Sequence, residues 1–136
     1  MLDDEKSMLN EPDAQLDALA HQVIGAAIEV HRRLGPGLDE GLYEQALSIE
    51  LPPRRIAFAR QVVVPVNYRN ESIGEKRLDM VIEGRLVVEL KAIEEIGRVH
   101  KAQLLTYLKI TGHKLGLLIN FNVAILKDGI HRIIRT

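Results

Sequence analysis

The chain has 136 residues, of which 46% are hydrophobic and 27% charged, with a net charge of −1 and no cysteine. This length suits one domain with its own core, and the missing cysteine excludes disulfides, thiolate zinc sites and iron–sulfur clusters. No run of about 18 apolar residues occurs, so we expect no transmembrane helix and no membrane partner. The acidic N-terminus lacks an apolar signal region, and a cytoplasmic location is expected.

Charge is distributed unevenly along the sequence. Residues 1–53 hold 3 Lys or Arg against 11 Asp or Glu, whereas residues 54–136 hold 15 against 8. This asymmetry permits a basic face on a near-neutral protein, which would suit a nucleic acid. A solvated surface with uneven charge accounts for the counts equally well.

Two helices are predicted at the start of the chain. Residues 1–12 are polar and aperiodic, which predicts a disordered acidic tail, and leaves 13–136 as a single domain. Apolar residues recur at helical spacing over 13–34, with Asp13 as the N-cap, and again over 38–51. Gly-Pro-Gly and Pro-Pro segments end these two helices.

Three strands are predicted next, over 60–69, 72–82 and 85–93, because these segments are rich in β-branched residues. Pro65 lies inside the first strand and indicates an edge position or a bulge. The first turn is predicted at 70–72, and Glu83-Gly84 can make the second.

The last third of the chain predicts one helix and three further strands. The helix spans about 99–111 and ends at a glycine. The strands span 115–120, 122–126 and 130–134, with Lys-Asp-Gly as the turn before the last one. The resulting order is ααβββαβββ, which is typical of a single α/β core.

Two carboxylates and a lysine are predicted to meet in the middle of the chain. Glu89 and Lys91 are two apart in a strand, so their side chains point to the same face. Asp79 lies ten positions upstream, across the hairpin, and can supply a second carboxylate. Two carboxylates suit a hard cation such as Mg²⁺ or Mn²⁺, and a nearby lysine can position water or stabilise developing charge. A buried ion pair, or a hairpin edge that faces water, is the structural alternative.

Two helices carry further polar residues. In the helix over 99–111, Gln103 and Tyr107 are four apart and share a face, with His100 on about the same side. That stripe can face solvent or contact the metal site and a phosphate. In the helix over 38–51, Glu40 and Tyr43 are three apart, and the helix dipole alone favours an acid at the position of Glu40.

Taken together, these segments resemble a known family. The segment from Gly37 reads GLDEGLY, ELK begins at Glu89, and QLLTY begins at Gln103, with Asp79 between them. This set resembles the GxxExxY family of small bacterial and archaeal proteins, which is placed in the PD-(D/E)xK nuclease superfamily. The resemblance runs from about residue 24 to residue 135 and includes the segments AQLLTYLK and GLLINFN.

The resemblance implies a restriction-endonuclease-like fold, in which helices flank a mixed β-sheet with an αβββαβ core. By analogy, Asp79 and Glu89 would ligate Mg²⁺ together with the carbonyl of Leu90. Lys91 would orient or activate the attacking water. Glu40 would complete the metal site, directly or through water.

The resemblance also implies contacts with nucleic acid. Gln103 and Tyr107 match the QxxxY element of RecB-like nucleases, whose helix contacts the site and DNA, and Gln103 is assigned to catalysis on that basis. Tyr43, His100 and Tyr107 are assigned to nucleic-acid binding. The chain departs from the superfamily's name at Leu78, where a proline would stand, and from the usual helix–glycine turn at residues 51–55.

The expected function is therefore a Mg²⁺-dependent nuclease that hydrolyses phosphodiester bonds, with DNA as the expected partner. The alternatives are a non-catalytic module that binds nucleic acid or protein within a repair or defence complex, and a structural domain with a buried Glu89–Lys91 pair. A homodimer is compatible with a small domain that exposes strand edges, although no residue pattern demonstrates it.

Overall fold

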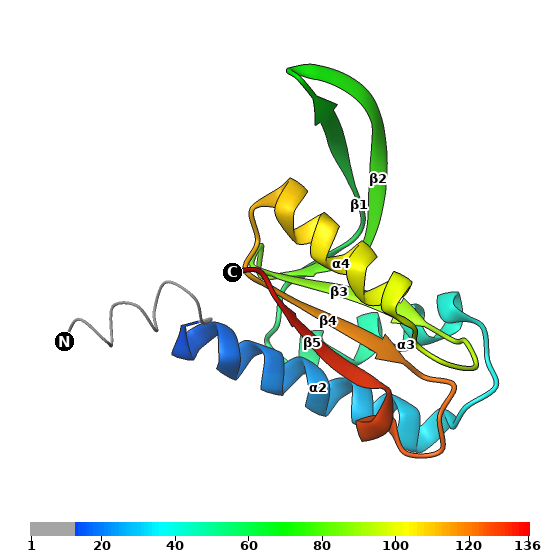
Figure 1. The fold of residues 1–136 in the computed structure, drawn as a ribbon. Coiled ribbons are helices and arrows are strands. Elements are labelled where there is room, and N and C mark those ends of the chain that lie inside the picture. Colours follow the sequence, from blue (N-terminus) through cyan, green and yellow to red (C-terminus); the bar gives the residue numbers. More distant parts are fainter. Residues whose placement is uncertain (1–12) are drawn as a thin grey trace.

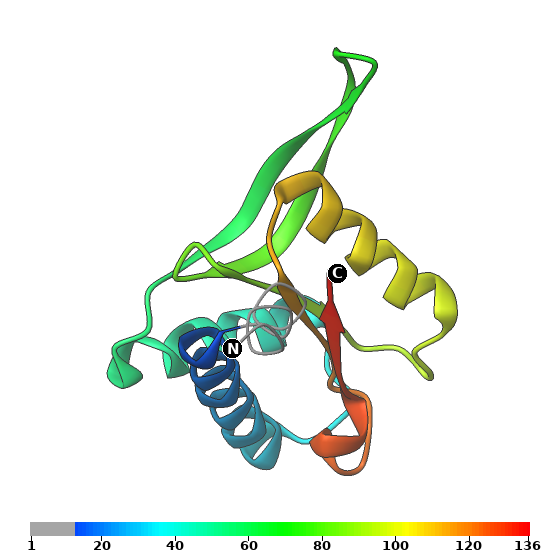
Figure 2. The ribbon, with the colours of Figure 1, turned by 60° about the vertical axis from the view of Figure 1, so that its left-hand side comes forward.

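The computed structural model describes residues 13–136, so the tail predicted over residues 1–12 lies outside the described residues. The described chain forms one five-stranded sheet with helices on both faces, as Figures 1 and 2 show. No helix among these residues is long and apolar enough to cross a membrane. In chain order the elements are α2 (Ala14–Leu34), α3 (Glu40–Glu50), the 3₁₀ helix η1 (Pro52–Arg54), β1 (Phe58–Tyr68), β2 (Glu71–Ile82), β3 (Leu86–Lys91), α4 (Arg98–Thr111), β4 (Leu115–Asn120), the 3₁₀ helix η2 (Leu126–Gly129) and β5 (Ile130–Ile134).

The helix boundaries follow the capping signals of the sequence. The Leu16 N–H donates to Oδ1 of Asp13 over 2.7 Å, which confirms Asp13 as the cap of α2. Gly112 ends α4 with a left-handed φ of 78°, as a C-terminal glycine does. The apolar stripe of α2 is buried against the sheet, which is where most of the stability of a surface helix originates.

The sheet has the strand order β1-β2-β3-β4-β5 and is mixed, because β3 and β4 run parallel while the other neighbours run antiparallel. The mixed α/β fold is thus confirmed. Strand β1 is an edge strand, which confirms the edge position inferred from Pro65. Strands β3 and β4 lie inside the sheet, and helices cover both of their faces, which accounts for their continuous apolar runs.

Two apolar clusters fill the space on either side of the sheet. The larger one joins α2 and α3 to one face, and the smaller one joins α4 to the other. Alternation along β3 places Val88 in the larger cluster and Val87 in the smaller. Glu89 and Lys91 have the parity of Val87, so their side chains lie on the α4 face.

The strand predicted over 122–126 is wrong, so the sheet has five strands, not six, and the order is ααβββαββ. Hydrogen bonds of Asn120 direct the chain away from the sheet after β4. The buried amide of Asn120 accepts from the Ile93 N–H and donates to the Ile93 carbonyl, and its oxygen also accepts from the Asn122 N–H. The Lys-Asp-Gly turn belongs to η2. An added Cβ at Gly129 would lie 2.1 Å from the Asn120 carbonyl oxygen, so only glycine fits there.

The first hairpin turn also differs from the prediction. It consists of Arg69 and Asn70, between the paired residues Tyr68 and Glu71, so the predicted turn at 70–72 falls one residue too late. Both turn residues have positive φ, 49° and 67°, as a two-residue type I′ hairpin requires.

Candidate active site

The backbone and side chains of Asp79 and Glu89 hold each other at the junction of β2 and β3. The Asp79 N–H donates to Oε1 of Glu89 over 3.1 Å. In return, Oδ2 of Asp79 accepts from the N–H of Leu90 over 2.8 Å. Backbone pairing between β2 and β3 stops at Met80, and beyond it these two bonds connect the strands. Each carboxylate is therefore fixed by the strand that carries the other.

A break in the other ladder frees Asp79 for this role. Strands β1 and β2 pair on both sides of Gln61 and Asp79 but not at these two residues. Gln61 has a φ of 51°, which is uncommon for a residue with a side chain. Its side chain donates to Oε1 of Glu44 on α3 over 2.7 Å. This side-chain bond holds Gln61 in the conformation that leaves Asp79 unpaired in the β1–β2 ladder.

Glu44 lies beside the site, although no sequence motif predicted a role for it. Its side chain is buried, and it pairs with Arg60 of β1, whose Nε donates to Oε2 over 2.9 Å. The charge of Glu44 raises the pKa of Asp79. The signal for Glu44 was its position one helical turn after Glu40, whereas no pattern pointed to Arg60 or Gln61.

Burial and like charge act together on the two carboxylates. Glu89 is only 8% exposed. Its burial, and then the charge of Asp79, raise the pKa of Glu89 to about 8. Burial likewise raises the pKa of Asp79, against the opposing effects of the Leu90 N–H and of Lys91. The positive charge of Lys91 thus only partly offsets the cost of ionising both carboxylates.

Glu40 stands farther out, at the start of α3. It is exposed, and partial burial followed by the charge of Asp79 raises its pKa, while Lys91 acts in the opposite direction. Over residues 13–136, no three His, Asp or Glu side chains are gathered closely enough to form a ready metal cage. The structure therefore brings Asp79, Glu89 and Lys91 together, with Glu40 at a longer range.

Helix α4 brings one of its predicted residues to the carboxylates. Tyr107 is 8% exposed, and burial, followed by the charges of Glu89 and Asp79, raises the pKa of its hydroxyl. Hydrogen bonding by the exposed Gln103 acts in the opposite direction. His100 lies at the other end of this face, where its Nδ1 accepts from the Gly97 N–H over 2.9 Å and caps the helix.

Tyr43, which the resemblance assigned to nucleic-acid binding, lies in the core. It is fully buried, and its ring stacks on Phe121 with 4.4 Å between centroids. Its hydroxyl donates to the Gly35 carbonyl over 2.6 Å and accepts from the Leu38 N–H over 3.1 Å. A ring enclosed in this way fastens the α2–α3 connection and has no free face for a base or a phosphate.

Comparison with known families shows to which superfamily the chain belongs. The family model of the PD-(D/E)XK nuclease superfamily matches residues 17–133. The chain belongs to this superfamily. Neither the curated proteins nor the solved structures yield a significant match. Membership indicates a nucleic acid as the class of substrate, and nucleases of the superfamily typically use divalent metals.

The residues present fit the divalent cation that the superfamily implies. Asp79 and Glu89 offer carboxylate oxygens, which Mg²⁺ and Mn²⁺ prefer. The pKa values of both groups are raised, chiefly by burial, so their ionised forms have too little positive charge nearby. A cation between the two carboxylates would supply that positive charge. With only two acids in contact, solvent would have to complete the coordination shell, which is usual for Mg²⁺.

Proposed function

We propose that this protein is a Mg²⁺- or Mn²⁺-dependent nuclease that hydrolyses phosphodiester bonds in DNA. The observation that carries the proposal is the pair of bonds between the strands, from the Asp79 N–H to the Glu89 carboxylate and from the Leu90 N–H to the Asp79 carboxylate, with Lys91 on the same face of β3 as Glu89. In the finer classification we place the chain in the GxxExxY group, with a RecB-like QxxxY element at Gln103 and Tyr107.

The cation would be held by the carboxylates of Asp79 and Glu89, with the Leu90 carbonyl as a further ligand and Glu40 acting through water. Glu40 is exposed at the start of α3, which supports a water-mediated role for this residue. When bound, a divalent cation supplies positive charge beside the phosphate and lowers the pKa of water.

Three side chains of the protein would then act on the phosphate and the water. The ammonium of Lys91, close to both carboxylates, would orient the water or stabilise the charge that develops on the phosphate. A tyrosine keeps its proton at neutral pH, and burial raises the pKa of Tyr107 further, so its hydroxyl can donate to a phosphate oxygen. Gln103 lies one turn away on the same helix and would orient the Tyr107 hydroxyl.

The charges on the two faces of the sheet support a nucleic-acid partner. Helix α4 carries three basic residues and no acidic one, whereas α2 and α3 together carry two basic and five acidic residues. The carboxylates of Glu89 and Asp79 thus open toward the basic face. A phosphate backbone would meet attraction from α4 and repulsion from α3.

Cleavage of a labelled DNA panel in Mg²⁺ or Mn²⁺ tests the proposal. Wild type should cut, whereas Asp79→Asn, Glu89→Gln and Lys91→Met should each lose at least 100-fold in rate, a typical loss for a metal-ligand or charge-stabilising group. The exposed Asp128→Asn is the matched control for loss of one negative charge. Equal cleavage by wild type and Asp79→Asn would trace the activity to a contaminant and reject the assignment.

A non-catalytic binding module is the second candidate, and the lack of a three-residue metal cage within residues 13–136 favours it. Calorimetry separates the two functions. A nuclease should bind Mn²⁺ at or below millimolar concentration and lose that binding in Glu89→Ala. DNA binding without any uptake of Mn²⁺ would favour the module.

A further inference from the structure

Strands β1 and β2 continue beyond the sheet as a two-stranded ribbon, which Figure 1 shows standing out from the domain. Strand β3 pairs with β2 only over Met80–Ile82, but the β1–β2 ladder continues outward to the pair Tyr68–Glu71. We call residues 62–78 the arm. Its second strand is exposed at every residue from Glu71 to Arg77. A free two-stranded hairpin is marginally stable in water, so the ordering of this one needs support.

The arm has that support at both ends. At its base, Leu78 belongs to the apolar cluster under α4, and Val62 and Val64 pack against that cluster. At its tip, the type I′ turn of Arg69 and Asn70 matches the natural twist of the strands. The arm is thus paired from its base to its tip, with one irregularity between Val66 and Asn67, and has a reach of roughly 23 Å at about 3.3 Å per residue.

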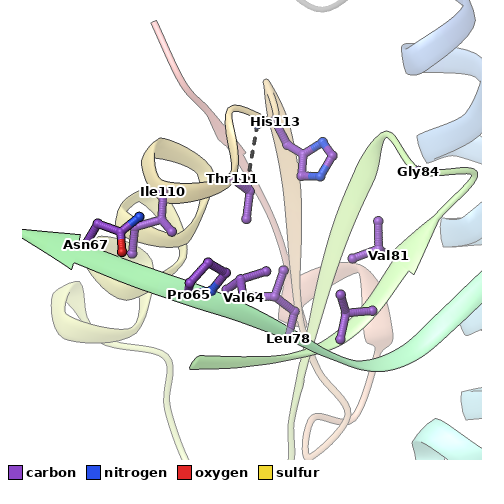
Figure 3. A pocket seen from close by; sticks show the side chains of 10 residues that line it. Val64, Pro65, Asn67, Leu78, Val81, Gly84, Ile110, Thr111 and His113 are labelled. Carbon is purple, nitrogen blue, oxygen red and sulfur yellow. Dashed lines mark hydrogen bonds between the residues drawn. The ribbon is translucent and has the colours of Figure 1, made fainter. Parts of the chain in front are cut away.

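A small cleft lies between the arm and the end of α4, and Figure 3 shows the side chains that line it. The cleft has a volume of about 320 Å³, and Val64 and Pro65 line one side and Ile110 and Thr111 the other. It contains none of the site carboxylates, and at about ten water volumes it is far too small for a nucleic-acid duplex. A nucleic acid that binds the arm would therefore contact its outer surface.

The outer surface suits a polyanion. The arm carries Arg69, Lys76 and Arg77 against two glutamates, all exposed. The adjoining α4 adds three further basic residues and no acid. The shape of the arm favours double-stranded DNA among polyanions, because the major groove of B-DNA, about 12 Å wide, admits a two-stranded β-ribbon. The major groove of duplex RNA is too narrow and deep for side chains to read, and a single strand has no groove.

We propose that the arm is a duplex-binding element that enters the major groove of double-stranded DNA and sets the position of a backbone phosphate at Asp79. Asp79 directly follows the arm, so a duplex held by Lys76 and Arg77 lies beside the carboxylates. This inference rests on the proposed function for its consequence, that the substrate is double-stranded, but the binding itself does not require cleavage.

The experiment measures binding in EDTA, where no cation-dependent cleavage occurs. Three ligands of equal length are compared: duplex DNA, duplex RNA and single-stranded DNA. The first variant has Asn-Gly in place of residues 66–74, which closes the shortened ribbon on the pair Pro65–Glu75 with a compatible turn. Duplex-DNA affinity should fall at least tenfold, whereas affinity for the other two ligands should change less than twofold.

A full-length variant guards against a folding defect in the shortened chain. Arg69→Ala, Lys76→Ala and Arg77→Ala combined should weaken duplex-DNA binding and flatten its salt dependence, by up to about 0.9 in log–log slope for each phosphate that is no longer neutralised. The matched control removes three exposed arginines from the opposite side of the sheet and should leave both quantities unchanged; these are Arg32, Arg33 and Arg54.

The outcomes separate the two proposals. Unchanged duplex-DNA affinity in both arm variants, or an equal loss for all three ligands, overturns the role of the arm even if the protein cleaves DNA. Arm-dependent binding of duplex DNA by a protein that cleaves nothing in Mg²⁺ or Mn²⁺ supports the arm and rejects the nuclease.

Discussion

Gln61 and Asp79 face each other across β1 and β2 at a step where the two strands do not pair. The positive φ of Gln61 and its bond to Glu44 create this gap, and the Asp79 N–H turns to Glu89 instead. A residue outside the family's motif thus positions one of the two acids on which the site depends.

Two substitutions of Gln61 should separate the effect of its backbone conformation on stability from the effect of its side-chain bond. Gln61→Ala loses the bond to Glu44 and keeps the left-handed backbone that the native residue already has, so it should destabilise the fold by about 1–3 kcal/mol. Gln61→Gly loses the same bond without the backbone cost and should be more stable than the alanine variant by about 1 kcal/mol. Urea denaturation gives this order. An alanine variant as stable as the glycine variant would contradict backbone strain at Gln61.

The same two variants should also weaken Mn²⁺ binding, because Asp79 could rejoin the ladder and leave Glu89. Calorimetry on the folded proteins measures the change, for which we expect several-fold. Ser48→Ala on α3 is a control that removes a side-chain bond away from the site.

Without a cation, Glu89 should make the fold less stable as the pH rises. Its pKa is about 8 in the folded chain against a usual 4.5, so the folded state holds the extra proton between these values. The contribution of Glu89 is complete below about pH 4.5 and is lost as the pH rises through about 8, by at most about 1.4 kcal/mol per pH unit. The raised pKa of Asp79 acts in the same direction.

Denaturation in EDTA at several pH values, with wild type and Glu89→Gln side by side, isolates this contribution. The difference in unfolding free energy should shift in favour of the variant from pH 5 to pH 8. Mn²⁺ should reverse the trend in wild type, since the cation competes with the proton. A constant difference between the two proteins would show that Glu89 titrates normally.

Lys91→Met should divide metal binding from cleavage. The lysine charge acts on both carboxylates, and a cation bound there would be repelled by it. Its removal should leave Mn²⁺ affinity equal or tighter by several-fold while cleavage falls. If Mn²⁺ binding disappears with the lysine, then Lys91 holds the carboxylates in place rather than serving the phosphate.

Tyr43→Phe should cost stability without affecting nucleic-acid binding. The variant keeps the stacking on Phe121 but leaves the Gly35 carbonyl and the Leu38 N–H without their partner. The expected loss is about 1–3 kcal/mol in urea denaturation. Gel-shift affinity for duplex DNA should remain within twofold of wild type, and a large loss of affinity in the stably folded variant would return Tyr43 to the binding surface.

Much of the fold was readable because local signals and burial agree. Caps such as Asp13, the helical stripes and the β-branched runs predicted the three α-helices and five of the strands within about two residues, but neither 3₁₀ helix. The failure at 122–126 has a physical reason, since that segment is apolar enough for a strand. What removes it from the sheet is the side chain of Asn120, whose bonds to Ile93 depend on tertiary structure.

The site was predicted in part for a similar reason. Strand parity correctly places Glu89 and Lys91 on one face. The bonds of Asp79 to Glu89 and Leu90 form where the β1–β2 ladder is interrupted, and nothing local marks Gln61 as a residue with positive φ. Tyr43 was assigned to nucleic-acid binding by the resemblance, and a motif does not say whether a side chain points to the core, where the structure places this ring.

The opposite charges of the two sheet faces also bear on how the protein would meet its substrate. Basic α4 on one side and acidic α3 on the other give the molecule an electric dipole across the sheet. In the field of a polyanion such a dipole is turned before contact, so encounters begin with the site facing inward. Salt shortens the range of this orienting force, to about 8 Å at physiological ionic strength. The association rate should therefore decline with salt more steeply than a net charge of −1 suggests.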